Sequence, residues 1–287
     1  MIGADNIKSI GVIGAGTMGS GIASVSALSG FKTILYDVKQ EALNKAQANI
    51  LKGYDKLFEK GKIDEQKRKS SEKNIECTLE LQKLYDTDFV IEAAIEKIEL
   101  KKDLFKKLDE ITKPDSVLAT NTSSFSITEI SVAVKNRARV AGMHFFNPAN
   151  IMKLVEVVKG ELSSDETLNI TIELCKKLGK TPVVCMDTPA FIVNRIARAF
   201  YLEPLRILEK EKMGVETIDL IMKNEGGFSM GPFELMDLIG IDVNLSVTKS
   251  VYEAFNHNPK YKPSPIQQKM VDEGRLGRKT GQGFYKY

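Results

Sequence analysis

The feature that most constrains the fold is a glycine pattern that directly follows a short apolar run. Residues 9–14 (SIGVIG) form a short, β-branched and apolar run, as expected for a strand buried on both faces of a parallel sheet. Gly14, Gly16 and Gly19 then form G-x-G-x-x-G, and residues 17–29 predict a helix. The first glycine allows a tight turn, the second lets the backbone approach a pyrophosphate, and the third lets helix pack on strand. The pattern therefore predicts an anion held at a helix N-terminus.

Asp37 strengthens this interpretation. It ends a second strand-like run, residues 32–36 (KTILY), and lies 18 residues beyond Gly19. At that spacing a carboxylate accepts hydrogen bonds from the adenosine ribose and repels a 2′-phosphate, which favours NAD over NADP. Lys39, two residues on, softens that preference. A lone G-x-G-x-x-G is compatible with a simple glycine-rich turn, but strand, turn, helix, second strand and acid together favour a dinucleotide site.

Strand-like and helical patterns alternate over residues 1–188, which predicts an α/β domain of the Rossmann type with a doubly wound sheet. The expected strands include 89–91, 117–119, 140–143, 154–158 and 182–185, with helices at 99–111 and 165–178. Residues 189–287 predict a second, all-helical domain, because strand-like runs become rare there. Its expected helices include 191–212, 217–223 and 233–255, and the glycine-rich tail 274–287 predicts a loop. Thr188-Pro189 marks the join, since threonine can cap a helix and proline suits its first turn.

A helical arm is expected over about residues 40–74. Lys45, Lys52, Lys56 and Lys60 fall on one side of a helix predicted over residues 40–60. Such a row is typical of a solvated face. The alternative is a surface whose ammonium groups meet the phosphates of a ligand.

Composition excludes few classes of protein but sets useful limits. A net charge of +3 is too small to indicate nucleic-acid binding. Cys77, Cys175 and Cys185 form no CxxC pair and no ligand spacing with the two histidines, so we expect neither disulfides nor a metal site. The N-terminus does not resemble a signal peptide, and no apolar run is long enough to span a bilayer. We therefore expect a cytoplasmic protein that does not bind a membrane.

His144 is the better candidate for acid/base chemistry. Imidazole exchanges protons near neutrality, and the chain has only His144 and His257. His257 lies in a polar, turn-rich stretch typical of a surface. His144 ends the run 140–143, which places it at the carboxyl edge of a strand, where ligands of open α/β sheets bind. A hydrogen-bonded core histidine is the alternative. Glu156, inside the apolar run LVEVV, would be costly to bury without a partner, and pairing with His144 would orient the ring.

Several blocks of the sequence, in order along nearly the whole chain, resemble the 3-hydroxyacyl-CoA dehydrogenase family in its compact bacterial 3-hydroxybutyryl-CoA dehydrogenase form. These blocks are GVIGAGTMGSGIA (11–23), VIEAAIEKIELKKDLF (90–105), LATNTSS (118–124), GMHFFNPANIMKLVEVV (142–158), DTPAFIVNR (187–195), MGPFELMDLIGIDVN (230–244) and GRLGRKTGQGFYKY (274–287). The resemblance implies an NAD-dependent oxidoreductase of fatty acid or butanoate metabolism that interconverts 3-ketoacyl-CoA, acetoacetyl-CoA first, and (S)-3-hydroxyacyl-CoA. It also implies a homodimer formed through the helical domain, which closes on the substrate.

The resemblance also implies roles for individual residues. The expected catalytic group is His144, Glu156, Ser123 and Asn194, with His144 as acid/base, Ser123 bonded to the 3-oxygen and Asn194 near the thioester. The expected cofactor contacts are Gly14, Gly16, Thr17, Met18, Gly19, Asp37, Glu96, Lys101, Asn121 and Ser123. Ser123, Asn194, Lys56 and Lys60 are the expected substrate contacts, the two lysines meeting coenzyme A phosphates. Ser123 has an alternative role, because NTSS is also a plausible helix cap.

The sequence departs from the family pattern at two positions, and three alternative functions remain. The family commonly has glycine at the position of Ala190 and proline at that of Ser229. Because alanine disfavours positive φ, we expect a slightly different path into the helix of Asn194. The stretch EGGFSMGPFELMDLIG also resembles enzymes that take 3-hydroxyadipyl-CoA. A non-catalytic NAD-binding relative and a dehydrogenase of free hydroxy acids are the other hypotheses, and the fold alone does not decide among them.

Overall fold

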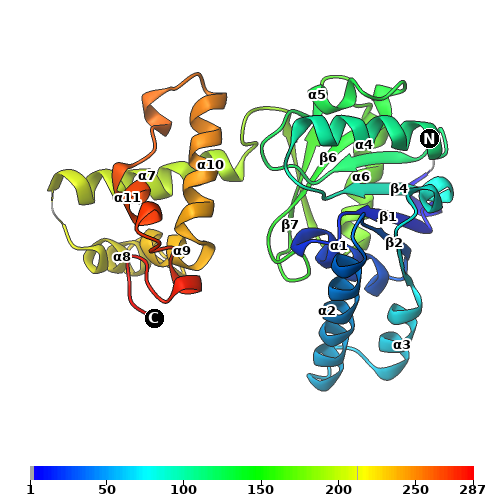
Figure 1. Ribbon diagram of the computed structural model, residues 1–287, viewed down its shortest axis with the longest axis horizontal. Coiled ribbons are helices and arrows are strands. Elements are labelled where there is room, and N and C mark those ends of the chain that lie inside the picture. Colours follow the sequence, from blue (N-terminus) through cyan, green and yellow to red (C-terminus); the bar gives the residue numbers. More distant parts are fainter. Residues whose placement is uncertain (1–2, 212) are drawn as a thin grey trace. The chain divides into compact units, whose positions relative to one another are not determined.

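The first unit is built on one sheet of eight strands, in the order β3-β2-β1-β4-β5-β6-β7-β8 (Figure 1). The computed structural model describes residues 3–211 and 213–287, which divide into two compact units between Thr188 and Pro189. The strands are β1 (Ser9–Ile13), β2 (Lys32–Tyr36), β3 (Ile75–Thr78), β4 (Phe89–Glu92), β5 (Val117–Thr120), β6 (Val140–Phe145), β7 (Leu154–Lys159) and β8 (Thr181–Met186). The predicted Rossmann-type sheet is confirmed.

The directions and the order of the strands indicate where a ligand can bind. All neighbouring strands are parallel except β6 and β7, which are antiparallel. From β1 the chain first builds outward through β2 and β3, and then returns to the other side of β1 with β4. In open α/β sheets a ligand binds in the crevice at such a reversal, which here lies at the carboxyl ends of β1 and β4. The edge strand β3 was not predicted, because its residues IECT are short and only half-buried.

Helices cover this sheet. They are α1 (Thr17–Leu28), α2 (Gln40–Glu59), α3 (Glu65–Lys73), α4 (Ile98–Ile111), α5 (Ile127–Ser131) and α6 (Asp165–Lys177). Apolar residues of α1, α2 and α6 join those of the strands in one buried cluster. Small residues along α1 (TMGSGIASVSAL) let it lie close to the sheet beside the glycine turn.

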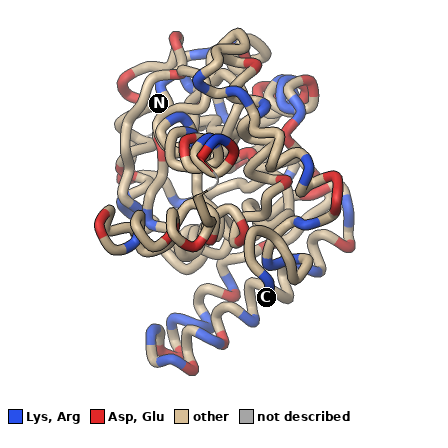
Figure 2. Tube along the Cα trace, turned by 90° about the vertical axis from the view of Figure 1, so that its left-hand side faces the viewer, with Lys and Arg blue, Asp and Glu red and all other residues tan. Residues whose placement is uncertain are grey.

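The arm consists of α2 and α3, which extend side by side away from the sheet (Figure 1). Leu43, Ala46, Ile50 and Tyr54 form the buried face of α2. The predicted lysine row lies on the exposed side, and Figure 2 shows basic positions recurring along the projecting arm, with acidic ones among them. The arm therefore carries charge into solvent, while the apolar face of α2 packs mainly against α1.

The second unit is helical, as predicted. It consists of α7 (Val193–Glu211), α8 (Val215–Asn224), α9 (Pro232–Ile239), α10 (Ile241–Ala254) and α11 (Pro265–Asp272). Tyr201, Leu205, Phe233 and Met236 lie at the centre of its main apolar cluster. None of the helices within residues 3–211 and 213–287 is both long and apolar enough to cross a bilayer.

Three predictions for this unit were wrong in detail. The helix expected over 233–255 is interrupted at Gly240, whose φ of 102° separates α9 from α10. Because α7 begins at Val193, Thr188 does not cap it and Pro189 is not in its first turn. The reason is that Ala190 and Phe191 have φ values of 64° and 49°, which no right-handed helix allows.

Ala190 thus adopts the left-handed conformation that we expected alanine to disfavour, at a cost of about 1 kcal/mol. Residue 212, the end of the helix expected over 191–212, lies outside the described residues.

Asp88 ties the start of β4 to the start of β1. Its Oδ2 accepts hydrogen bonds from Lys8 N (2.8 Å), Ser9 N (2.9 Å) and Ser9 Oγ (2.9 Å), and its Oδ1 lies 2.7 Å from Lys113 Nζ. Burial raises the pKa of Asp88, but the ammonium of Lys113 and these hydrogen bonds outweigh it, so the net shift is downward. The folded protein therefore stabilises the ionised carboxylate more than the unfolded chain does.

We expect Asp88→Asn to lower the free energy of unfolding by about 1–3 kcal/mol at pH 7, because charge-assisted hydrogen bonds are lost. A lowered folded pKa contributes stability above the unfolded value, about 3.9, and that stability is lost as pH falls through the folded pKa. Urea unfolding of both proteins should therefore show a constant difference near neutrality that closes in acid. Asp86→Asn removes a neighbouring carboxylate that is 74% exposed and should change little. A difference that persists undiminished at acid pH would contradict this account.

Candidate functional site

The glycine turn opens the crevice between β1 and β4. Gly14 has a φ of 97°, and a Cβ there would lie 2.6 Å from Ala93 O, so only glycine fits. A Cβ on Gly19 would overlap the carbonyl oxygen of Gly14. A Cβ on Gly16 would meet no atom within 4 Å, which leaves open space above the turn. The turn thus combines two tight backbone contacts with one open approach, as a bound pyrophosphate requires. Thr17 and Met18 begin α1 directly behind it.

Asp37 follows β2 and closes one side of the turn. Its Oδ2 accepts a hydrogen bond from Ala15 N (2.7 Å) and its Oδ1 one from Lys39 N (2.9 Å). Each carboxylate oxygen has two acceptor sites, so both can still accept hydroxyl groups of a ligand. The carboxylate is therefore fixed beside the turn and keeps acceptor capacity for a ribose.

His144 and Glu156 face each other across the antiparallel pair β6–β7. They are paired residues in the register, and His144 Nδ1 lies 2.7 Å from Glu156 Oε2. His144 is 6% exposed and Glu156 is fully buried. The His144 ring also packs against Phe146, with centroids 4.6 Å apart. The carboxylate thus fixes the ring by its Nδ1, as the sequence predicted from the acid in an apolar run.

Asn121 joins the strand ends on the His144 side of this pair. Its Oδ1 accepts a hydrogen bond from the backbone N–H of Phe145 (2.8 Å), next to His144. Its own backbone N–H donates to Glu92 O (2.7 Å) at the end of β4. Asn121 therefore holds the carboxyl ends of β4, β5 and β6 at one edge of the sheet.

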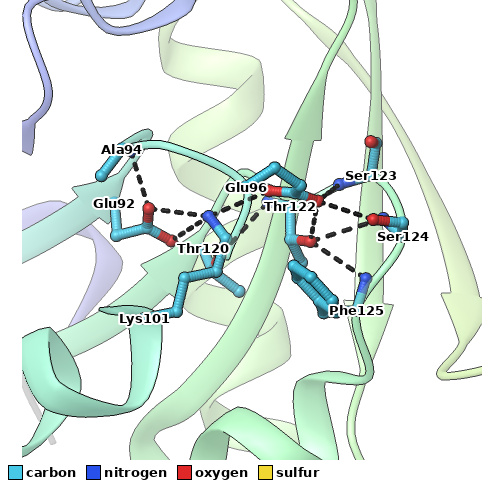
Figure 3. A network of polar contacts seen from close by, with 9 residues as sticks. All are labelled: Glu92, Ala94, Glu96, Lys101, Thr120, Thr122, Ser123, Ser124 and Phe125. Atoms are coloured by element: carbon cyan, nitrogen blue, oxygen red, sulfur yellow. Dashed lines mark hydrogen bonds and ion pairs between the residues drawn. The ribbon is translucent and has the colours of Figure 1, made fainter. Parts of the chain in front are cut away.

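Ser123 lies in a loop that Glu96 holds (Figure 3). Glu96 Oε1 accepts hydrogen bonds from Thr122 Oγ1 (2.5 Å), Ser123 N (3.1 Å) and Ser124 Oγ (2.9 Å). Burial raises the pKa of Glu96, but the nearby ammonium of Lys101 and the hydroxyl hydrogen bonds lower it more, so the net shift is downward. The helix-cap alternative for Ser123 was wrong, since Ser126 is the residue that caps α5.

Lys101 and Glu92 form a buried ion pair below this loop. Their side chains are 1% and 0% exposed, and the ammonium lies 2.8 Å from Glu92 Oε1. The same ammonium lies 3.1 Å from Glu96 Oε2. Sequence reasoning did not single out Glu92, although it lies in the apolar run VIEA just as Glu156 lies in LVEVV. A carboxylate inside a buried strand was the signal that would have found it.

The remaining expected residues lie elsewhere. Lys56 and Lys60 are exposed on the arm. Asn194 is half-buried on α7 of the second unit, so it is not among the residues that the first unit brings together. His257 is exposed, as predicted, and packs against Tyr252. Within the described part of the chain, no three side chains of His, Cys, Asp or Glu group as metal ligands.

Family models match both units. The model of the 3-hydroxyacyl-CoA dehydrogenase NAD binding domain matches residues 9–188, and that of the 3-hydroxyacyl-CoA dehydrogenase C-terminal domain matches residues 191–287.

Individual proteins agree with this result. The chain is 46% identical over 98% of its length to the 3-hydroxyadipyl-CoA dehydrogenase of Escherichia coli, of which it spans only 59%. It is 45% identical over 96% of its length to a probable 3-hydroxybutyryl-CoA dehydrogenase of Deinococcus radiodurans, covering 99% of that protein. The crystal structure of (S)-3-hydroxybutyryl-CoA dehydrogenase from Ralstonia eutropha superposes with a TM-score of 0.94 at 38% identity, over 98% of this chain and 99% of that one.

Proposed function

The chain belongs to the 3-hydroxyacyl-CoA dehydrogenase family of NAD-dependent oxidoreductases, and from this premise we propose that it interconverts acetoacetyl-CoA and (S)-3-hydroxybutyryl-CoA. The observation that carries the proposal is the 2.7 Å pairing of His144 Nδ1 with the buried Glu156, at the sheet edge that also bears the glycine turn. A fixed imidazole beside a dinucleotide crevice suits proton exchange with a carbonyl oxygen.

The crevice fits NAD. The open approach at Gly16 suits the pyrophosphate, and Asp37 suits the adenosine ribose hydroxyls. Glu96 and Asn121 lie beyond β1, on the β4–β5 side, where the nicotinamide half of a dinucleotide would extend. When bound, NAD(H) supplies or accepts the hydride at C3 of the acyl group.

His144 carries the proton that accompanies this hydride. Because Glu156 holds Nδ1, proton exchange with the substrate falls to Nε2. In the reducing direction the imidazolium donates that proton to the developing alkoxide, and the carboxylate of Glu156 stabilises the positive ring beforehand. In the oxidising direction the neutral imidazole accepts the hydroxyl proton. Ser123, in the loop held by Glu96, would donate a hydrogen bond to the 3-oxygen. The family resemblance gives Asn194 a part in polarising the thioester.

We expect the arm to bind coenzyme A phosphates. The double variant Lys56→Glu/Lys60→Glu should raise the Michaelis constant for acetoacetyl-CoA roughly tenfold, because the reversed charges repel the phosphates. A factor of 10 corresponds to a loss of about 1.4 kcal/mol of binding free energy. The constant for NADH should stay unchanged, because the glycine turn lies on a different part of the unit. Steady-state kinetics at fixed ionic strength measure both constants.

Lys106→Glu on α4 is the matched control, since it reverses an exposed charge of the same unit. An unchanged constant for acetoacetyl-CoA in the arm variant would favour a substrate without coenzyme A, such as a free hydroxy acid.

An activity series tests the function itself. NADH oxidation should be rapid with acetoacetyl-CoA and slower with longer 3-ketoacyl thioesters. A second candidate is 3-hydroxyadipyl-CoA, because a relative that is 46% identical carries that name. Faster turnover of the thioester with a terminal carboxylate would favour it. NADH binding without turnover of any thioester would contradict both and favour a non-catalytic role.

We also propose a homodimer formed through the second unit, in the cytoplasm. Leu220 and Ile221 of α8 and Leu238 of α9 are each at least 50% exposed, which is costly for apolar side chains of a lone subunit. The mass in solution tests the assembly, and a monomer at micromolar concentration would contradict it.

Cys77, Cys175 and Cys185 are unpaired thiols, compatible with a reducing compartment.

A further inference from the structure

Glu92 uses both oxygens of a fully buried carboxylate at the end of β4 (Figure 3). Oε1 accepts hydrogen bonds from Ala94 N (2.7 Å) and Lys101 Nζ (2.8 Å). Oε2 accepts from Lys101 Nζ (2.9 Å) and Thr120 Oγ1 (2.6 Å). The contacts join β4, β5 and α4, so this one group fixes the ends of three elements around the crevice.

The ion pair is more than a device for stability. A buried ion pair is seldom more stabilising than apolar residues of the same volume, because both charges lose their hydration. Here the ammonium of Lys101 also faces Glu96, whose side chain is 38% exposed. One cation thus holds two carboxylates, one fully buried and one at the surface of the crevice.

Glu96 links the ammonium of Lys101 to the loop that contains Ser123. Its Oε2 faces Lys101, and its Oε1 accepts hydrogen bonds from Thr122 Oγ1, Ser123 N and Ser124 Oγ. Moving the ammonium would therefore move the acceptor on which the loop conformation depends. Thr120 adds a second link, because its Oγ1 donates to Glu92 and accepts from Thr122 N (3.2 Å).

We propose that Glu92 is a positioning residue, which acts through Lys101 and Glu96 to hold Ser123 in the conformation that meets the substrate. This inference rests on the proposed function, since it takes Ser123 as a substrate contact. With Glu92→Gln the ammonium keeps only Glu96 as a charged partner, and Glu96 is drawn away from the loop. We expect kcat to fall about 10- to 100-fold, the effect of a small misplacement of a reacting group. The Michaelis constant for acetoacetyl-CoA should change little, because the arm holds the coenzyme A moiety.

A double-mutant cycle of Glu92→Gln and Lys101→Met tests the pathway. If Glu92 acts through Lys101, the double variant should have the kcat of Lys101→Met within a factor of about 2, the accuracy to which independent effects add. Effects that multiply would overturn the proposal, as would a wild-type kcat in Glu92→Gln. If neither single variant folds, the double variant provides the test, because it leaves no unpaired charge of this pair buried. A wild-type kcat in the double variant would also overturn the proposal.

Hydrogen exchange gives a readout that needs no substrate. Peptides covering residues 121–125 should exchange faster in Glu92→Gln, Lys101→Met and the double variant, to a similar extent, because the Ser123 N–H loses its bond to Glu96. Asp109→Asn is the matched control: it breaks another buried ion pair of the unit, 2.8 Å from Arg139, and should leave loop exchange and kcat unchanged.

The experiments distinguish failure of the proposed function from failure of the positioning role of Glu92. If the wild type turns over no thioester while loop exchange follows the cycle, the proposed function is wrong and the positioning of the loop stands. If the wild type is active and Glu92→Gln has wild-type loop exchange, the positioning role is wrong.

Discussion

His144→Gln is expected to fold like the wild type and to lose a factor of about 10²–10⁴ in kcat, the usual contribution of a positioned acid/base. Glutamine can still bond to Glu156, so the buried carboxylate keeps a partner and the sheet should survive. It cannot exchange a proton near neutrality, so the alkoxide loses its donor. Turnover of saturating acetoacetyl-CoA, followed by NADH absorbance, measures the loss.

The second histidine provides the control. His257→Gln changes an exposed side chain of the second unit and should leave the rate unchanged. Near-wild-type turnover in His144→Gln would remove this residue from the mechanism, while equal losses in both variants would indicate a general effect on folding.

Glu156→Gln should have an effect of similar size, about 10²–10⁴ in kcat, by analogy with triads in which the acid that orients a histidine is made an amide. The neutral amide no longer stabilises an imidazolium. Its NH₂ group can also donate to Nδ1, which leaves the proton of the neutral ring on Nε2 and removes the acceptor that the oxidising direction needs. Circular dichroism and NADH binding should stay close to the wild type, because the change is isosteric.

Glu161→Gln, just after β7, removes an exposed carboxylate and is the matched control. A Glu156→Gln variant with more than half of the wild-type kcat would show that the ring needs no charged partner. Wild-type activity of Glu161→Gln, together with loss in Glu156→Gln, would place the effect in the buried pair.

Local signals made the first part of the fold predictable. The run SIGVIG, the glycines behind it and Asp37 lie within 29 residues, so their spacing along the chain was enough to identify the turn. The contact that requires glycine at position 14 is with Ala93, which lies far along the sequence. The pairing of His144 with Glu156 was also predictable, because an acid in an apolar strand needs a partner.

Other parts depended on contacts that a single sequence does not contain. The break at Gly240 was missed because an isolated glycine is tolerated within a helical pattern. The start of α7 was missed because positive φ is rare for alanine and phenylalanine, so neither residue type signals the left-handed conformation that both adopt. For the network around Lys101, the sequence supplied the carboxylates, but their sharing of one ammonium depends on how α4 returns to β4.

The antiparallel register of β6 and β7 sets the geometry in which His144 and Glu156 share a proton. Backbone hydrogen bonds between the strands keep the facing side chains in place, and a slip of one position would turn them to opposite sides of the sheet. The connection between the strands, residues 146–153, is largely exposed and is not part of that ladder. The distance across which a proton is shared therefore depends on the strand ladder, and not on the conformation of this connection.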